Sequence, residues 1–358
     1  MSGFRGDLYR GSLDVMARGQ ARSGAFVASP TFPTYRFCWI QDGAFVALAM
    51  DEAGEHDSAA AFHRWVAGVV ARRRSTVERL EQGPPDVLTE ADVLHTRYTL
   101  DGDDGTEPWS NFQLHGYGEW LSALARHLGG ARTPPGEFLS AVNLVVRYLA
   151  LLWDRPCYDC WEEFPDRIHP ATLANVAGGL RRAATLLDDP DPAALAGRIE
   201  ERIMARSTTA DGAMAKFEEP HDDAVDGSAL LAIGPLGTFS PGLPLVAATV
   251  RRIEADLVAD GGGVHRYLED EFYGGGLWLP LSSALAWMQA TLGNTDRARE
   301  VVEWMEGTAD DRGNFPEQVP RRLRKPDRFR PWVERWGPVA NPLLWSHAMY
   351  VLARRALA

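Results

Sequence analysis

The sequence predicts an all-α protein, an (α/α)6 barrel in which about twelve helices form a closed double ring. Apolar residues recur at helical spacing in one segment after another, and alternating strand patterns are almost absent. No repeat of fixed period indicates an open solenoid, which is the alternative architecture. The length of 358 residues suits one large domain, so we predict a single domain over residues 1–358.

Five helices are predicted in the first part of the chain. Phe62, Trp65 and Val69 recur at helical spacing, and Asp57 or Ser58 can cap their helix. Glycines follow the fourth helix directly, and a Thr-Pro pair opens the fifth. The predicted ranges are 6–22, 42–54, 57–74, 113–127 and 133–153.

Seven helical segments follow in the second part, two of them divided by Pro190 and Pro192. Their predicted ranges are 170–187, 191–206, 222–233, 241–257, 277–292, 294–306 and 341–356. Three long stretches without helical periodicity lie between the helices, at 76–110, 207–240 and 307–340. Joints of this length are usually functional or disordered, and in a closed ring they would gather on one face and build a site.

Composition excludes several classes of function. The net charge is −12, which argues against general nucleic-acid binding. No signal-peptide pattern is present and no apolar run is long enough to cross a bilayer, so we expect a cytoplasmic protein. Three cysteines fit a reducing compartment, and Cys157-x-x-Cys160 lacks the second pair that a zinc site needs. We therefore predict no metal and no cofactor.

The stretch from Asp159 to Glu163 places two adjacent carboxylates behind a tryptophan. Adjacent residues do not face the same way, so Glu162 and Glu163 can do different jobs. A carboxyl group beside Trp161 in a dry site can have a raised pKa and donate a proton. From this stretch alone, a helix start with acidic residues in its first turn is the favoured alternative.

Aromatic and charged side chains recur in the joints, and together they predict a carbohydrate pocket. Aromatic faces stack on the C–H faces of sugars, while carboxylates and arginine bind hydroxyl groups. Any single tryptophan is more often a core anchor at a helix end, so the prediction depends on the whole set. The set is Tyr35, Trp39, Gln41, Asp42, Trp109, Trp161, Glu162, Glu163, Arg266, Asp270, Tyr273, Trp278, Glu317, Gln318 and Trp345.

Glycoside hydrolysis needs two carboxyl groups, one on each side of the bond that breaks. In an inverting enzyme they stand roughly 6.5–9.5 Å apart, which leaves room for a water molecule. Glu317, in a loop after a helix, is the natural partner for Glu162. The two are far apart in the sequence, and only the fold can bring them together.

Six short motifs contain most of these residues: YRFCWIQDGAF (35–45), WSNFQLHGYG (109–118), DCWEEF (159–164), VHRYLEDEFYGGGLW (264–278), GNFPEQ (313–318) and NPLLWSHA (341–348). In their order, and over nearly its whole length, the chain resembles glycoside hydrolase family 15, the glucoamylase family. The resemblance implies an (α/α)6 barrel that removes glucose from non-reducing ends with inversion of configuration.

The resemblance also implies roles for individual residues. Glu162 would be the general acid and Glu317 the general base. Tyr35 and Trp345 would flank the charged sugar ring, and Trp161 and Glu163 would line the sugar sites. The remaining substrate-binding residues would be Trp39, Gln41, Asp42, Trp109 and Arg266, to which Tyr273 and Trp278 are added by a less direct match.

Two positions depart from the family pattern. Gln41 stands where members usually have Arg, and His115 stands where they often have Asp. Gln is a neutral amide and Arg a charged fork, so hydroxyl binding would be weaker or different. We interpret both as altered specificity, with lost activity as the alternative. The chain also lacks the β-sandwich and starch-binding modules of other members, and is expected to be the catalytic barrel alone.

The predicted activity is release of β-glucose from short α-glucosides, isomaltose above all, as in single-domain bacterial isomaltose glucohydrolases. Short α-1,4 malto-oligosaccharides and trehalose are the alternative substrates. A non-catalytic oligosaccharide sensor on the same scaffold is the alternative of another class, and a helical protein-interaction scaffold is a further one. The expected partner is a small oligosaccharide, without nucleic acid or membrane. The sequence leaves homo-oligomerisation open.

Overall fold

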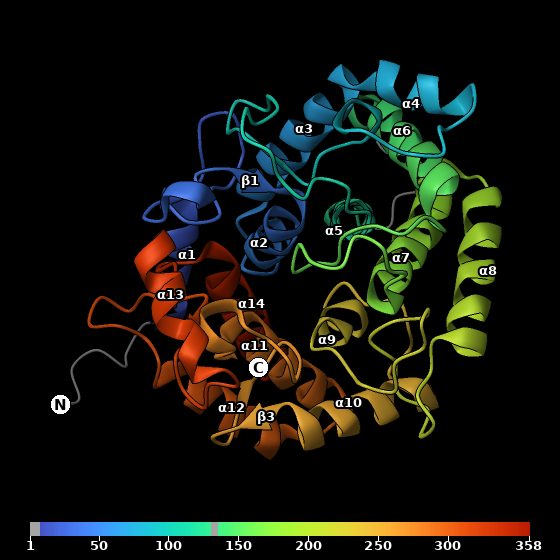
Figure 1. Ribbon diagram of the computed structural model, residues 1–358. Coiled ribbons are helices and arrows are strands. Elements are labelled where there is room, and N and C mark those ends of the chain that lie inside the picture. Colours follow the sequence, from blue (N-terminus) through green and yellow to red (C-terminus); the bar gives the residue numbers. More distant parts are fainter. Residues whose placement is uncertain (1–7, 130–134) are drawn as a thin grey trace.

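The computed structural model describes residues 8–129 and 135–358, which contain fourteen α-helices (Figure 1). Their bounds are α1 Leu8–Arg18, α2 Ile40–Glu52, α3 His56–Arg72, α4 Arg74–Glu81, α5 His115–His127, α6 Gly136–Leu152, α7 Pro170–Leu187, α8 Asp191–Arg206, α9 Ser228–Ile233, α10 Pro244–Asp256, α11 Leu279–Thr291, α12 Thr295–Glu306, α13 Pro326–Trp336 and α14 Leu344–Ala356. In these described ranges, no helix is both long and apolar enough to cross a membrane.

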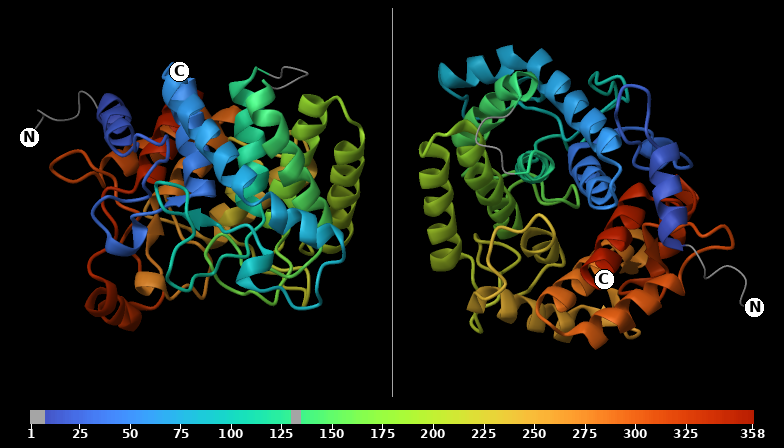
Figure 2. Two further views of the ribbon diagram at one scale, coloured as in Figure 1. Left: turned by 90° about the horizontal axis from the view of Figure 1, so that it is seen from above. Right: turned by 180° about the vertical axis from the view of Figure 1, so that it is seen from behind.

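Six helices form an inner ring that closes on itself. Each of α2, α5, α7, α9, α11 and α14 contacts the next, and α14 returns to α2. Helices α1, α3, α6, α8, α10 and α12 pack around them, as the two opposite views along the barrel show (Figures 1 and 2). The predicted (α/α)6 double ring is therefore confirmed.

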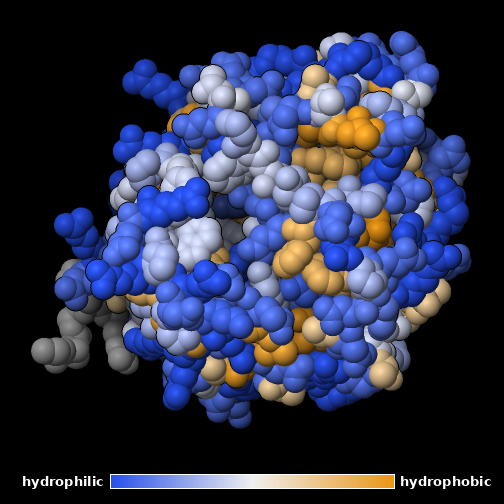
Figure 3. All heavy atoms as spheres, viewed as in Figure 1, coloured by the Kyte–Doolittle hydropathy of each residue, from blue (hydrophilic) through white to orange (hydrophobic). Residues whose placement is uncertain are grey.

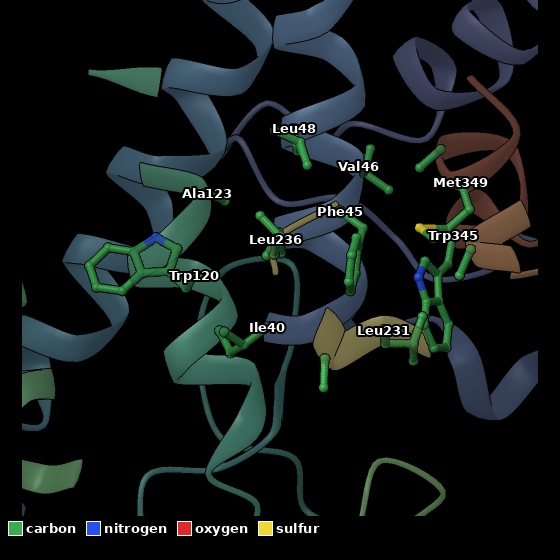
Figure 4. Close-up of a cluster of buried hydrophobic side chains, with 14 of the residues drawn as sticks. Ile40, Phe45, Val46, Leu48, Trp120, Ala123, Leu231, Leu236, Trp345 and Met349 are labelled. Carbon is green, nitrogen blue, oxygen red and sulfur yellow. The ribbon is translucent and has the colours of Figure 1, made fainter. Parts of the chain in front are cut away.

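The inner helices are buried over most of their faces because neighbouring helices cover them. In α2 nearly every residue from Ile40 to Met50 is buried. Phe45 of α2 stacks on Trp345 of α14, with ring centroids 6.0 Å apart, in the cluster drawn in Figure 4. The outer helix α8 instead buries one stripe, through Leu195, Ile199 and Ile203. The inner helix α2 is thus a nearly continuous apolar segment, whereas the outer helix α8 has a single apolar stripe, and each pattern made its helix predictable.

Six two-residue strands tie the joints together at one end of the barrel. β1 (Cys38–Trp39) pairs antiparallel with β2 (Arg97–Tyr98), which sets Trp39 opposite Arg97. The second sheet has the order β3 (Val258–Ala259), β4 (Gly263–Val264), β5 (Leu277–Trp278) and β6 (Gln318–Val319). Strands of two residues are too short to produce an alternating pattern, so the sequence did not predict them.

Two helices lie where the sequence predicted joints. α4 falls in the 76–110 stretch, and α13 falls in the 307–340 stretch. α4 buries only Val77 and Leu80, and α13 buries no residue fully and contains Pro331. Both lie outside the double ring, so neither carries the apolar pattern of a core helix. The prediction of non-helical joints is wrong at these two places.

Helix boundaries also differ in places. α1 ends at Arg18 and not at residue 22, and α9 covers only Ser228–Ile233 of the range predicted as 222–233. The predicted start of the fifth helix at Thr133-Pro134 lies outside the described residues.

Candidate active site

The joints that lead into the inner helices converge on one pocket at the end of the barrel. Its volume is about 580 Å³, including the part open to solvent. Figure 3 shows this face of the molecule, which is largely hydrophilic with a shaded hollow near its middle. The lining residues are Ala28, Tyr35, Trp39, Gln41, Asp42, Cys160, Trp161, Glu162, Arg266, Phe272, Trp278, Glu317, Leu343 and Trp345.

Glu162 lies in a tight turn, not at a helix start. The carboxylate of Asp159 accepts hydrogen bonds from the backbone N–H groups of Trp161 and Glu163, both at 2.9 Å. Glu162 itself has a φ of 67°, a left-handed conformation that is rare for a residue other than glycine. Such strain concentrates at functional sites, and the helix-start interpretation is wrong.

Two indole groups fix one carboxylate oxygen of Glu162. The Nε1–H of Trp39 donates to Oε1 at 2.8 Å, and that of Trp109 donates to the same oxygen at 2.6 Å. The guanidinium of Arg97 lies 3.5 Å from the ring centroid of Trp109. The β1–β2 pairing holds Trp39 and Arg97 side by side. The β1–β2 pair thus contributes one donor and one cation on the Glu162 side, and the loop that carries Trp109 contributes the second donor.

Glu163 faces a different group of partners, as the sequence predicted for two adjacent residues. Arg266 donates to Glu163 Oε1 at 3.3 Å, and the hydroxyl of Tyr267 donates to Oε2. Arg266 is also paired with the fully buried Asp270. Glu163 therefore orients Arg266 at the pocket wall, while Glu162 reaches the pocket itself.

Glu317 comes from the other side of the pocket, directly before β6. Its backbone N–H donates to Ala340 O at 2.9 Å, and the next residue, Gln318, pairs with Trp278 of β5. The hydroxyl of Tyr35 donates to Glu317 Oε1 at 3.0 Å. The fold thus brings Glu162 and Glu317 into one pocket.

The electrostatics of the empty pocket favour the protonated form of its carboxyl groups. Burial raises the pKa of Glu317 to about 8, although Tyr35 and Arg266 act to lower it. Burial also raises the pKa of Asp42, to about 7, with a contribution from Glu162. The pKa of Glu162 is raised by burial as well, against the opposing effect of Trp39, Trp109 and Arg97. Because the pKa is raised in both glutamates, the pKa shifts do not show which one is the acid and which the base. Their roles are therefore assigned from their positions in the family motifs.

A second, outer cleft joins the pocket. Its volume is about 1160 Å³, including open solvent, and it shares Tyr35, Trp161, Glu162 and Phe272 with the pocket. Trp109, Glu163 and Tyr273 line only this cleft. Every residue to which the resemblance gives a substrate-binding role therefore lies at the pocket or at the cleft, and these roles remain predictions. Asp270 and Gln318, which belonged to the wider set predicted for a carbohydrate pocket, line neither cavity: Asp270 is paired with Arg266, and Gln318 accepts a hydrogen bond from Gly276.

The two departures from the family pattern contact each other. Gln41 Oε1 lies 3.2 Å from His115 Nε2, and both side chains are buried. Burial lowers the pKa of His115 to about 3, so the imidazole is neutral. Where the family pattern has two charged residues, this chain has a neutral amide beside a neutral ring. The two departures therefore lie together, with Gln41 in the pocket wall and His115 beside it.

Several residues at the site were missed in the sequence. Arg97 lies outside all six motifs, whereas Phe272 stands beside Tyr273 within one of them. The outer cleft is completed by α13, with Trp332, Arg335 and Trp336. Tyr273 connects the cleft wall to the end of α13, because its hydroxyl donates to the backbone oxygen of Gly337, directly after that helix, at 3.0 Å. The aromatic residues of 329–336 were the available signal for this wall.

An (α/α)6 barrel that brings a buried glutamate, a partly buried glutamate and several tryptophans to one pocket has the architecture of a glycoside hydrolase. Comparison with known families agrees: the model for glycosyl hydrolases family 15 matches residues 5–301. The chain belongs to this family.

Relatives over the full length agree with the family. The isomaltose glucohydrolase of Kribbella flavida is 40% identical over 357 residues, covering 97% of this chain and 91% of the relative. An uncharacterized glycosyl hydrolase of Methanocaldococcus jannaschii is 23% identical, covering 92% of this chain and 52% of that protein.

Solved structures show the same fold. A wild-type glycosidase and a glycosidase variant in complex with glucose each superpose with a TM-score of 0.91 at 39% identity, covering 98% of this chain and 96% of theirs. A bacterial glucoamylase complexed with acarbose has a TM-score of 0.75 at 20% identity, covering 98% of this chain and 55% of that one, and shows the fold alone.

The chain is thus a glycoside hydrolase, and its family and relatives support exo-acting hydrolysis of α-glucosides with inversion. This confirms the predicted family, fold and enzyme class. It contradicts the alternative of a helical protein-interaction scaffold.

Proposed function

We propose that this enzyme removes glucose from the non-reducing end of isomaltose and short isomalto-oligosaccharides, with Glu162 as general acid and Glu317 as general base. The observation that carries the proposal is that both glutamates line one pocket of a chain 40% identical to an isomaltose glucohydrolase. The α-1,6 linkage comes from that relative.

The proposed reaction moves two protons. Glu162 donates its proton to the glycosidic oxygen as the bond to the anomeric carbon breaks. Ionised Glu317 takes a proton from a water molecule, whose oxygen bonds to the anomeric carbon from the opposite face. The products are β-glucose and the shortened sugar. Glu162 ends ionised and Glu317 protonated, and exchange with solvent restores both.

The two cavities divide the substrate between them. We assign the terminal glucose to the inner pocket, with Tyr35 and Trp345 beside its ring and Asp42 and Arg266 at its hydroxyl groups. Glu162 lines both cavities, which fits a group that acts on the oxygen between two sugars. The leaving sugar would therefore lie in the outer cleft, among Trp109 and the residues of α13.

The neutral Gln41–His115 pair adjusts recognition of the terminal glucose. Gln41 lines the pocket, and its side chain also interacts with the buried carboxyl group of Glu119. The amide has two N–H groups, so one can face Glu119 while the other is a donor toward the pocket. We assign it to a sugar hydroxyl, and so retain the interpretation of altered specificity.

We also propose that residues 1–358 act as one catalytic domain in the cytoplasm, without a nucleic-acid partner. One continuous hydrophobic core extends from Val15 to Ala353, which supports a single folding unit. The three cysteines form no disulfide, which supports a reducing compartment. The net charge of −12 supports the absence of nucleic acid.

The test is incubation of the purified protein with isomaltose, maltose, maltotriose and trehalose, with the anomer of released glucose followed by NMR. We expect β-glucose from isomaltose first. If glucose is released faster from maltose or trehalose than from isomaltose, the preferred linkage is the one in that substrate and not α-1,6. α-Glucose as the first product would contradict inversion, and tight binding without turnover would support the sensor alternative.

A further inference from the structure

A second group of chemically reactive side chains lies at the end of the barrel opposite the pocket. Asp51 is in the last turn of α2, whose first turn carries Gln41 and Asp42. His127 is the last residue of α5, which begins at His115. His63 lies on α3, between these two helix ends. We propose that Asp51, His63 and His127 bind one divalent transition-metal ion, for which Zn²⁺ is the best match.

The geometry of the three side chains fits a metal site. One ligand atom from each residue lies within 4.8 Å of the other two. His127 Nδ1 is 2.9 Å from Asp51 Oδ2, and the rings of His63 and His127 have centroids 5.1 Å apart. Ligand atoms around tetrahedral zinc, at about 2.0–2.1 Å from the ion, stand about 3.3 Å from one another. Small side-chain rotations bring the three atoms to that spacing.

His63 is the observation that points to a ligand. Its side chain is 0% exposed, and neither ring nitrogen has a hydrogen-bond partner among the described residues. Each buried polar group without a partner costs about 1–3 kcal/mol. Burial and the neighbouring His127 lower the pKa of His63 to about 3, so its imidazole is neutral. Neutral imidazole is the form that coordinates a metal.

The charges around the cluster allow a cation to bind. Hydrogen bonds from His127 and His56 hold the pKa of Asp51 below its usual range, although burial alone would raise it. Arg126 and Arg355 line the adjoining pocket and oppose a cation, while Glu52, in the same pocket, offsets part of their charge. Two imidazoles and one carboxylate select zinc and its neighbours over Mg²⁺ or Ca²⁺, which prefer oxygen ligands.

A fourth ligand has a route to the ion. The adjoining pocket has a volume of about 890 Å³, including open solvent, and is lined by Asp51, His127 and His56. The side chain of His56 is 71% exposed, and its Nδ1 is 3.0 Å from Asp51 Oδ1. Water or His56 would complete the tetrahedron. The bound ion would tie α2, α3 and α5 together at the end of the barrel where the glycosidase chemistry does not take place.

The test starts from full-length protein freed of metal with a chelator. Zn²⁺ is titrated by calorimetry, and Co²⁺ is added separately as a spectroscopic probe of tetrahedral coordination. We expect one equivalent of Zn²⁺, tetrahedral Co²⁺ absorbance that Zn²⁺ abolishes, and a rise in Tm of about 5 °C at roughly 100 times the Kd. Hydrolysis of the sugar substrate by metal-free enzyme should be unchanged at 25 °C, which separates this proposal from the catalytic one.

Variants locate the ion. Asp51→Asn and His127→Gln should each weaken Zn²⁺ binding at least about tenfold. His95→Gln is the matched control, because His95 is also a buried imidazole near two carboxylates, Glu90 and Asp104. It should bind Zn²⁺ as the unaltered protein does.

Three results would overturn the proposal. The first is a Kd for Zn²⁺ in the millimolar range or weaker, with no tetrahedral Co²⁺ spectrum. The second is unchanged binding in both cluster variants, which would place the ion on other groups such as the active-site carboxyls. The third is stabilisation by inorganic phosphate and not by Zn²⁺, which would make the pocket of Arg126 and Arg355 an anion site. If the variants fail to fold, the Co²⁺ spectrum of the unaltered protein still tests the proposal, because the absence of tetrahedral coordination would overturn it.

Discussion

The two glutamates of the pocket are held by different kinds of structure. Glu162 stands on a strained turn, and its carboxylate accepts two indole N–H groups. Glu317 stands at the start of an extended strand, 4% exposed, and accepts one hydroxyl, that of Tyr35. The turn and the strand reach the same pocket from opposite sides. The comparison teaches that the local backbone sets the position of each carboxyl group, whereas its pKa depends first on burial and then on donors that other joints contribute.

The largest expected effect is loss of either carboxyl group. Glu162→Gln and Glu317→Gln should each lower kcat on isomaltose by about 10³-fold or more, because each removes one of the two proton transfers. Circular dichroism should show an unchanged fold. Near-normal activity in either variant would contradict the assignment.

A substrate with a good leaving group then separates the two roles. α-Glucosyl fluoride needs little help from an acid, so Glu162→Gln should hydrolyse it far better than isomaltose, relative to the unaltered enzyme. Glu317→Gln should be poor on both substrates, because water still needs a base. The reverse pattern would exchange the roles of the two glutamates.

The next largest effect is expected from removal of the positive charge of Arg97, which lies near Glu162. Arg97 lowers the pKa of Glu162, so Arg97→Met should raise that pKa and keep the acid protonated to higher pH. The alkaline limb of the pH profile of kcat/KM should move upward, with a loss of about tenfold in kcat from poorer positioning of Trp109. Arg155→Met, far less buried, should leave the profile unchanged. An alkaline limb that does not move would remove Arg97 from this role.

A smaller effect is expected on the Glu317 side. The hydrogen bond from Tyr35 lowers the pKa of Glu317, which burial raises to about 8. Tyr35→Phe should therefore raise this pKa, so the base is ionised only at higher pH and the acidic limb of kcat/KM moves upward. We expect a loss of about tenfold at neutral pH that shrinks as the pH rises. A loss that is the same at every pH would assign Tyr35 to sugar stacking alone.

The smallest effect should come from α13, away from both carboxyls. Trp336 is 37% exposed and lines the outer cleft. Trp336→Ala should raise KM for isomaltotriose about two- to fivefold and leave kcat on isomaltose unchanged, because only the longer leaving group reaches it. Equal effects on the two substrates would show that α13 acts by supporting the pocket and not by binding sugar.

The sequence predicted the parts of the molecule that carry a local pattern. The inner ring was predictable because helices such as α2 are buried on nearly all sides, and the site was predictable where short motifs contain Glu162 and Glu317. α13 was not, because it covers the cleft from outside and buries no residue fully.

Individual contacts between residues distant in the sequence could not be predicted unless a family motif implied them. Gln41 and His115 were noted separately as departures, and only the packing of α2 against α5 shows that they touch. Arg97 belongs to no motif and acts through its pairing with Trp39. The cluster of Asp51, His63 and His127 draws one residue from each of three helices, so no spacing in the sequence marks it.

The left-handed backbone of Glu162 has a consequence for evolution and engineering. A residue with a side chain is disfavoured in that conformation by about 1–2 kcal/mol, and glycine is not. Glu162→Gly would remove this strain and a partly buried carboxyl group at once, and would also remove the proposed acid. A search that rewards thermal stability alone would therefore select inactive proteins at this position. Under the proposed role of Glu162 as the acid, selection for turnover would keep a glutamate there.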